Sequence, residues 1–388
     1  MIKMYNVGFG ESILLNNDDN CLLVDCGSEK PNKDHIFDSI YNELYNYKYK
    51  TALITHFHND HINGFTNMIE KHRHVFDEII IPNIFCYGIN SILQTNRLNL
   101  IDLEIIKYLL ERKKIKNGRL SVLELLSSLV KSMSKISVAE RGDTFQLVGS
   151  EFEILWPNPH YLLDEKTEES LLHTIPSLDD LINTINEISY DIMQIYRNVI
   201  EYNGEENIQN NLARINNIAS RILELPSLEV SEHIIQKWLD KIKRIENNTS
   251  IVMQSKLYKP SILLTGDVVD STMEKVFEDY YEPHIKTYDY YTIIKAPHHG
   301  TDSNHFVKFD TYTKFDYIFI SNGETNIPNR GKISKKYHSC FNNYKIYCTN
   351  TNGDRCQYYK TFNRICNNSG FTTPTSLIRY DKERNVIF

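Results

Sequence analysis

Four potential metal ligands lie within six residues in the run His56-Phe57-His58-Asn59-Asp60-His61. The run follows residues 51–55, a short apolar segment that predicts a buried strand. Side chains at positions i and i+2 of an extended segment point the same way, so His56 and His58 can bind one ion together. Asp60 and His61 follow at the turn into a predicted helix, where they can reach a second ion. The spacing therefore predicts a metal site at the end of this strand.

Two later segments are predicted to complete this site. Residues 262–267 indicate a buried strand that ends in Asp267, whose carboxylate can bridge two ions. Residues 293–300 again run from a strand into a loop that contains the pair His298-His299. Because both segments place their polar residues directly after a strand, as the first run does, we expect Asp267 and His299 to join the ligands.

Histidine and carboxylate ligands without thiolates are typical of open sites for Zn²⁺, Mn²⁺ or Fe. A bound divalent ion lowers the pKa of its water to ~7 in favourable cases, and two ions about 3.5–4 Å apart can share the resulting hydroxide. We therefore expect a hydrolase that holds two divalent metal ions with a metal-bridging hydroxide. Zn²⁺ is the first choice of ion, and Mn²⁺ or Fe is the alternative.

The segments around these residues alternate between strands and helices, which is typical of an α/β fold. Two stretches break the alternation because they are helical throughout, residues 88–135 and residues 161–246. The second stretch carries three apolar stripes at spacings of three and four, which predict a small bundle or a lid. In the first stretch, Ser121-Val122-Leu123-Glu124 predicts a capping box at the start of a helix.

The composition is that of an ordinary globular protein, with 41% apolar residues, 24% charged residues and a net charge of −7. This balance does not favour a surface that coats nucleic acid, since such surfaces neutralise phosphates with Lys and Arg, but a local groove stays open as an alternative. Seven cysteines without a CxxC pair indicate free thiols in a reducing compartment. With neither a secretory signal nor an apolar run of ~20 residues, we expect a cytoplasmic protein without membrane contact.

The order of strand, HxHxDH, helix, then Thr-Gly-Asp, then His-His-Gly resembles that of the metallo-β-lactamase superfamily. It is similar in particular to the branch that includes the hydrolase domain of bacterial DNA-uptake (competence) proteins and the choline-phosphate esterases. Supporting segments are residues 6–15, 22–27, 154–157, 247–252 and 321–323. The resemblance implies an α/β fold of the αββα metallo-β-lactamase sandwich type with two helical insertions. Its catalytic domain would comprise residues 1–83, 136–160 and 247–388, and the insertions residues 84–135 and 161–246.

The resemblance also implies a role for each candidate residue. It assigns the first ion to His56 and His58, the second ion to Asp60, His61 and His299, and the bridge between them to Asp267. Asp25 would orient ligand histidines from behind. His298 would contact a substrate phosphate or protonate a leaving group, and the alternative is a structural histidine.

Two segments depart from the pattern of this family. Many members carry a further histidine, a ligand of the first ion, where this chain has Asn247-Asn248. The DNA-uptake branch often has Gly-His-Pro where this chain has residues 324–331, which contain no histidine. There Arg330 is suited to binding phosphate, and Asn326 or Asn329 is the alternative lining residue. The occupancy of both metal positions is therefore the point to check.

We expect a phosphodiesterase or nuclease that acts on a phosphoester substrate, either a nucleotide or nucleic acid. The predicted catalytic residues are Asp60, His298, Lys295 and Arg330. The positive side chains of Lys295 and Arg330 would stabilise charge on the phosphoryl group. The alternatives are hydrolysis of a carboxylic ester, lactone or thioester, and a non-catalytic metal-binding partner protein in a multi-protein bacterial system. The helical insertions suggest a protein partner or an oligomer contact, and a role in phage defence or nucleotide signalling would fit a bacterial member of this branch.

Overall fold

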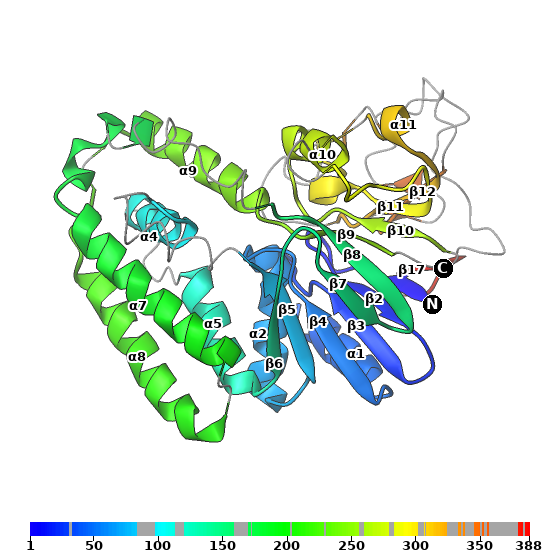
Figure 1. The fold of residues 1–388 in the computed structure, drawn as a ribbon, viewed down its shortest axis with the longest axis horizontal. Coiled ribbons are helices and arrows are strands. Elements are labelled where there is room, and N and C mark those ends of the chain that lie inside the picture. The colour runs from blue at the N-terminus through cyan, green and yellow to red at the C-terminus, as the bar shows by residue number, and fades with distance from the viewer. Residues whose placement is uncertain are drawn as a thin grey trace.

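Strands from both ends of the chain form two large mixed sheets in the computed structural model, with helices packed against them (Figure 1). The prediction of an α/β fold is therefore confirmed. The described residues are 1–30, 33–83, 98–112, 120–158, 170–171, 173–201, 204–228, 230–255, 260–278, 283–301, 306, 308–323, 333–334, 337, 345–349, 351–352, 355–356, 379–382 and 385–388.

The first sheet has the strand order β16-β17-β1-β2-β3-β4-β5-β6. Its strands pair antiparallel from β16 to β3 and parallel from β3 to β6. Parallel neighbours need crossover connections, and α1 (Asp34–Leu44) and α2 (Asn59–His72) supply two of them. The strands are β1 (Ile2–Met4), β2 (Ile13–Asn16), β3 (Asn20–Val24), β4 (Tyr49–Leu53), β5 (Glu78–Pro82), β6 (Lys135–Ala139), β16 (Arg379–Tyr380) and β17 (Val386–Ile387).

The second sheet has the order β13-β12-β11-β10-β9-β8-β7. Here the strands from β10 to β13 pair parallel and the rest pair antiparallel. Helix α10 (Asp270–Phe277) connects β10 to β11, and α11 (Phe309–Tyr312) connects β11 to β12. The strands are β7 (Thr144–Leu147), β8 (Ser150–Trp156), β9 (Val252–Ser255), β10 (Ile262–Leu264), β11 (Tyr290–Lys295), β12 (Lys314–Ile320) and β13 (Lys345–Cys348), and a separate pair is formed by β14 (Thr351–Asn352) and β15 (Arg355–Cys356).

Each sheet buries apolar side chains on both of its faces. One core cluster joins the two sheets, with Leu22 from β3 and Ile293 from β11 among its members. On its other face the first sheet shares a cluster with helices that include α1 and α2, to which β3 contributes Leu23. The other face of the second sheet packs with α10 and α11, and β10 contributes Leu263 there. Side chains alternate along a strand, so strands buried on both faces need the uninterrupted apolar runs seen in β3 and β10.

The helices predicted in the two helical stretches pack on one another at one side of the sheets (Figure 1). In the first stretch, of which residues 88–97 and 113–119 lie outside the described part, they are α4 (Leu100–Glu111) and α5 (Ser121–Ser132). In the second stretch, α7 (Ile182–Glu201), α8 (Glu205–Glu224) and α9 (Glu232–Asn247) follow the three predicted stripes. Helix α4 contacts α7 and α9, and α5 contacts α7, α8 and α2. The two stretches thus form one helical body, while the domain boundaries stay a prediction.

The capping box predicted at Ser121 is wrong. Helix α5 has Leu120 as its N-cap, so Ser121 is already its first helical residue, and no side chain caps this end. A capping box is present instead at α4, where the Asn99 side chain accepts from the backbone N–H of Asp102 at 3.1 Å. The Asp102 carboxylate accepts from the backbone N–H of Asn99 at 2.6 Å.

Two expectations on membranes and thiols can be compared with the described residues. No helix among them combines the length and the apolar character needed to cross a bilayer. Cys21, Cys26 and Cys348 are buried free thiols.

Gly27 fixes the approach of the loop after β3 to the start of α2. A Cβ placed on it would lie 2.1 Å from the carbonyl carbon of Asp60 and 2.3 Å from the backbone nitrogen of His61. We expect Gly27→Ala to lower the free energy of unfolding by about 3 kcal/mol or more, because the obstructing atoms are backbone and cannot rotate away. Chemical denaturation measures the change. Gly204→Ala is the control, since a Cβ there meets no atom within 4 Å and should cost less than about 1 kcal/mol through the N-cap of α8. Equal losses would contradict this account.

Candidate metal centre

The candidate site lies where parallel strands of both sheets end. Asp25 follows β3 and the run from His56 to His61 follows β4, while Asp267 follows β10 and His298-His299 follow β11. The carboxyl ends of parallel neighbours share one edge of a sheet, which collects each pair of loops. A backbone hydrogen bond of 2.9 Å from Ile251 N to Thr55 O joins the two edges.

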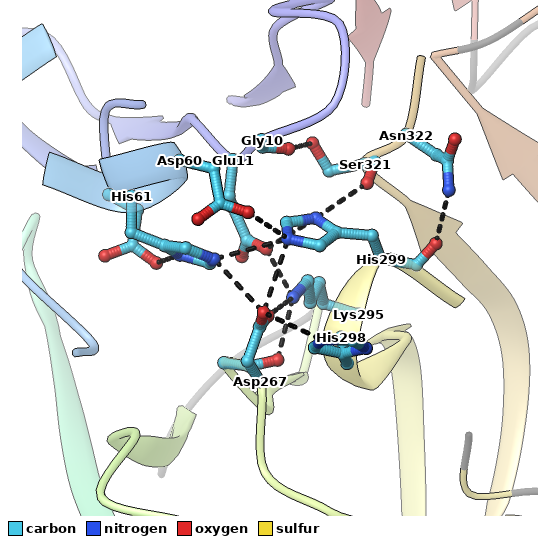
Figure 2. A network of polar contacts seen from close by, with 12 residues as sticks. Gly10, Glu11, Asp60, His61, Asp267, Lys295, His298, His299, Ser321 and Asn322 are labelled. Carbon is cyan, nitrogen blue, oxygen red and sulfur yellow. Dashed lines mark hydrogen bonds and ion pairs between the residues drawn. The ribbon is translucent and has the colours of Figure 1, made fainter. Parts of the chain in front are cut away.

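Three predicted ligands converge at the centre of the site (Figure 2). Asp267 Oδ2 lies 3.2 Å from His61 Nε2 and 3.3 Å from His299 Nε2, and these two nitrogens lie 3.3 Å apart. Glu11 joins them, because one ligand atom from each of the four side chains lies within 4.8 Å of all the others. All four residues are buried. Their chemistry and spacing make this cluster a possible metal-binding group.

The remaining predicted ligands line the same centre. Asp60 Oδ2 is 3.4 Å from His299 Nε2, and Asp60 lies in the first turn of α2, where the helix dipole favours a carboxylate. His56 Nε2 and His58 Nδ1 are 3.0 Å apart. The ring centroids of His56 and His61 are 4.1 Å apart. The structure therefore brings together all six residues predicted as metal ligands, which are His56, His58, Asp60, His61, Asp267 and His299.

Each of the four histidine rings has a hydrogen-bond acceptor next to the ring nitrogen that points away from the centre. The contacts are His61 Nδ1 to Asp25 Oδ2 at 2.8 Å, His299 Nδ1 to Ser321 O at 3.0 Å, His58 Nε2 to Glu246 Oε2 at 2.7 Å, and His56 Nδ1 to Thr55 Oγ1 at 3.2 Å. Thr55 donates its own hydroxyl proton to Asp25 Oδ2 at 2.7 Å, so its oxygen is free to accept from His56. With a ring proton on each outer nitrogen, the inner nitrogen of a neutral ring presents a lone pair to the centre.

These inner nitrogens and the carboxylate oxygens repel one another unless positive charge lies among them. Burial lowers the pKa of His61, but the carboxylates of Asp267 and Asp25 outweigh it and raise that pKa well above its usual value. In the same way, Asp267 and Asp60 overcome burial and raise the pKa of His299 to about 9. Protons would therefore supply the positive charge when no ion is bound. Converging nitrogen and oxygen donors at a buried point are also what a divalent cation binds, so the residues present fit such an ion.

Lys295 is buried and surrounded by oxygens of the protein. Its Nζ pairs with Glu11 Oε2, lies 3.6 Å from Asp267 Oδ1 and donates to Gly266 O at 2.8 Å. Burial lowers the pKa of Lys295, and the carboxylates of Glu11 and Asp267 more than compensate, so the group stays charged. This geometry suits a cation that holds two carboxylates in place. Its predicted contact with substrate stays a prediction.

His298 and His299 both adopt left-handed backbone conformations, with φ of 48° and 56°. Such conformations cost about 1–2 kcal/mol per non-glycine residue, and they are retained where surrounding contacts hold them. The contacts here are Asn322 Nδ2 donating to His299 O at 2.9 Å and His298 N donating to Gly266 O at 3.2 Å. The resulting turn directs His299 into the centre, while the side chain of His298 keeps 18% of its surface exposed.

The two segments that depart from the family pattern are residues 324–331 and Asn247-Asn248. Arg330, like Asn326 and Asn329, lies outside the described residues. Asn248, where many members of that family carry a histidine, accepts a hydrogen bond at Oδ1 from Thr272 Oγ1 at 2.7 Å. Asn247 Oδ1 is buried and has no hydrogen-bond partner among the described residues.

Sequence reasoning missed two carboxylates of the site, Glu11 and Glu246. Glu11 follows the Gly8-Phe9-Gly10 loop between β1 and β2, and its only signal was a charged residue next to apolar strands. Glu246 lies in the last turn of α9, where a charged residue normally faces solvent. Burial, followed by the nearby Lys107 ammonium, lowers the pKa of its partner His58 to about 4, so that ring is neutral near pH 7.

Replacing Asp25 tests how the rings are held. We expect Asp25→Asn to weaken Zn²⁺ binding by about 10- to 100-fold, because an amide offers His61 and Thr55 fewer acceptor positions. Competition with a chromogenic chelator measures the affinity. Asp38→Asn, which removes an exposed carboxylate paired with Lys71, is the control and should bind like the unmodified protein. Unchanged affinity in Asp25→Asn would contradict this role.

Metal binding is expected to release protons at pH 7. His61 and His299 have raised pKa values, so they are largely protonated in the metal-free protein, and an ion must displace those protons to bind. Apparent affinity should therefore increase as the pH rises toward about 9 and fall below pH 7. Calorimetric Zn²⁺ titrations in two buffers with different ionisation enthalpies give the number of protons released. Identical heats in both buffers would refute the expectation.

Residues 4–89 of the chain match the family model described as Anti-Pycsar protein Apyc1. This segment runs from the end of β1 past β5 and includes Glu11, Asp25 and the run from His56 to His61. Asp267 and His299 lie outside it. No curated protein matches the chain.

This match corrects the family and the function predicted from the motifs. The matching family is the Anti-Pycsar family, not a metallo-β-lactamase family or its DNA-uptake and choline-phosphate esterase branch, so that assignment was wrong. The predicted phosphodiesterase or nuclease for nucleotides or nucleic acid, with its ester, lactone, thioester and non-catalytic alternatives, is overturned by the same match. The physical reason is that the spacing of histidines and carboxylates reports how ions can be held. It does not encode the substrate that reaches them. Over residues 4–89, the chain is similar to a family named for acting against Pycsar.

Proposed function

We propose that this protein acts against a Pycsar-type defence by degrading the cyclic nucleotide that serves as its signal. The observation that carries the proposal is the match of residues 4–89 to the Anti-Pycsar model. That segment includes Asp25 and the whole run from His56 to His61, so the similarity covers four of the six predicted ligands of the candidate site. We propose the cytoplasm as the place of action.

The proposal includes enzymatic activity at a centre with two divalent ions, Zn²⁺ first and Mn²⁺ or Fe as alternatives. His56 and His58 would hold one ion, and the second would be held by Asp60, His61, Asp267 and His299. Bound ions would supply Lewis-acid polarisation of a phosphoryl oxygen. The proposed architecture places this centre at one edge of two facing sheets, each with helices on its outer side, which the three apolar clusters support.

The exposed part of the site indicates where a substrate enters. Side-chain exposure is 19% for His58 and 18% for His298, while His61, His299 and Asp267 have 2% or less. A cyclic nucleotide would therefore approach between His58 and His298, with its phosphate toward the buried ligands.

The ring of His298 contacts Thr301 and faces the buried carboxylate of Asp267. The Thr301 hydroxyl donates its proton to the backbone oxygen of His298 at 2.9 Å. Its oxygen, Thr301 Oγ1, can therefore accept a hydrogen bond from His298 Nδ1 at 2.7 Å. The other ring nitrogen, Nε2, lies 3.9 Å from Asp267 Oδ2 at the centre. Burial lowers the pKa of His298 to about 4, so the ring is neutral near pH 7. A ring that is neutral near pH 7 carries no imidazolium proton to give a leaving group, which disfavours the proton donation expected from the sequence, and a pKa near 4 also makes the ring a weak base.

The test is degradation of cyclic nucleotides by the metal-loaded protein. A panel of 3′,5′-cyclic mononucleotides and cyclic dinucleotides is incubated with Zn²⁺- or Mn²⁺-loaded protein, and chromatography follows the loss of each compound. We expect loss of at least one of them. Asp60→Ala should slow it by at least about 100-fold, because a ligand of the centre is removed. Asp38→Ala, an exposed change on α1, should leave the rate unchanged.

Two outcomes would overturn the proposal. The first is that folded, metal-loaded protein leaves every cyclic nucleotide intact. The second is tight binding of a cyclic nucleotide without any product, which would mean that the protein sequesters the signal and is not an enzyme.

A further inference from the structure

One ligand histidine is held by the helical body and not by the sheets. His58 Nε2 contacts Glu246 Oε2 at 2.7 Å, and Glu246 lies in the last turn of α9, 188 positions further along the chain. The other three rings are held by Asp25, Thr55 and Ser321, which follow strands of the two sheets. His58 is therefore the one ligand ring in the described site whose orientation depends on the inserted helices.

The Glu246 carboxylate is itself fixed by a second inserted helix. Lys107 Nζ on α4 lies 2.8 Å from both Glu246 Oε1 and Glu246 Oε2, and it also donates to Glu104 Oε1 at 3.0 Å. The side chains of Glu104, Lys107 and Glu246 are 6%, 12% and 5% exposed. A buried carboxylate held by a two-oxygen contact has little freedom to turn away from His58. The contact thus links both helical stretches to the site.

Glu246 does not stabilise the helix that carries it. The carboxyl end of a helix has a partial negative charge that disfavours a carboxylate, and burial of a charged group costs free energy unless it is paired. Its pairing runs to Lys107 on another helix and to His58 in the site. The placement is accounted for by those two contacts.

We propose that Glu246 is a positioning residue that, held by Lys107, fixes the ring of His58 for the first ion; this rests on the metal centre of the proposed function. When Glu246 accepts a hydrogen bond from Nε2–H of His58, the lone pair of that ring is on Nδ1. Nδ1 faces His56 Nε2 at 3.0 Å. Carboxylates that accept from a ligand imidazole fix its tautomer and raise its basicity. Glu246 does for His58 what Asp25 does for His61. The helices α4 and α9 therefore contribute to the affinity of the first ion position through His58, while the other ligand rings are held by residues that follow strands.

The first measurement is the tautomer of His58 in the metal-free protein, read from long-range ¹H–¹⁵N correlations of the histidine rings. We expect the proton on Nε2 in the unmodified protein and a mixture of tautomers in Glu246→Ala. Glu246→Gln keeps the side-chain volume and one acceptor oxygen, so it should retain more of the Nε2–H form. A proton on Nδ1 in the unmodified protein would overturn the proposal without bearing on catalysis.

The second measurement is Co²⁺ titration of the metal-free proteins, followed by the visible absorption of each bound ion. We expect Glu246→Ala to weaken one of the two binding events by about 10- to 100-fold and to leave the other unchanged, with a smaller loss in Glu246→Gln. Lys243→Met is the matched control, because Lys243 pairs with Glu111 at 3.9 Å between the same two helices, α9 and α4, away from His58. Equal affinities in Glu246→Ala and the unmodified protein would overturn the proposal.

The two measurements also separate this proposal from the proposed function. If the unmodified protein binds no ion, the metal centre fails, while the tautomer of His58 still reports on the contact with Glu246. If it binds ions and degrades no cyclic nucleotide, the proposed function fails and the affinity comparison stands. Thermal unfolding of each variant checks that loss of affinity does not come from loss of the fold, and Glu246→Gln remains informative if Glu246→Ala does not fold.

Discussion

The site is governed by the repulsion among electron pairs directed at one buried point. Each of the four histidine rings can donate a hydrogen bond to an acceptor on the side away from the centre. The other ring nitrogens then face the centre, where the carboxylates of Asp60 and Asp267 lie. Such an arrangement is stable only with positive charge in its midst, which protons or a divalent ion can supply. The neighbouring parts of the fold serve this requirement. The ligands follow strand ends, the Asn322 side chain and the Gly266 carbonyl hold the turn at His298-His299, and Lys295 offsets the charge of Glu11 and Asp267.

The part of the site that could be predicted from the sequence consists of residues whose setting is local. In the run from His56 to His61, the local backbone conformation alone determines where the ligand side chains point. The extended segment aligns His56 and His58, and the start of the helix places Asp60 and His61. Asp267 and His299 could be located because each directly follows an apolar run that is long enough for a strand. The same local patterns predicted the α/β class and the described helices of both helical stretches correctly.

The residues that were missed have positions set by contacts between distant elements. Glu246 looks like an ordinary solvated residue at the end of an amphipathic helix, and only the packing of α9 on α4 buries it beside His58. Glu11 likewise meets Lys295 through the approach of two sheets. The capping box at Ser121 shows a local pattern overridden by its context, since α5 begins one residue earlier than the motif requires. The family and substrate were misread because ligand spacing records the ions and not the molecule they act on.

The contact between His61 and His299 closes a loop of 238 positions. During synthesis, the amino-terminal segment leaves the ribosome with histidines that have no complete ligand set, because Asp267 and His299 are not yet made. Helices α4, α5, α7, α8 and α9 lie between the two histidines in the sequence, so they are synthesised before Asp267 and His299. The candidate centre therefore cannot assemble until His299 has been synthesised, and an ion bound there would connect the beginning of the chain to its final third.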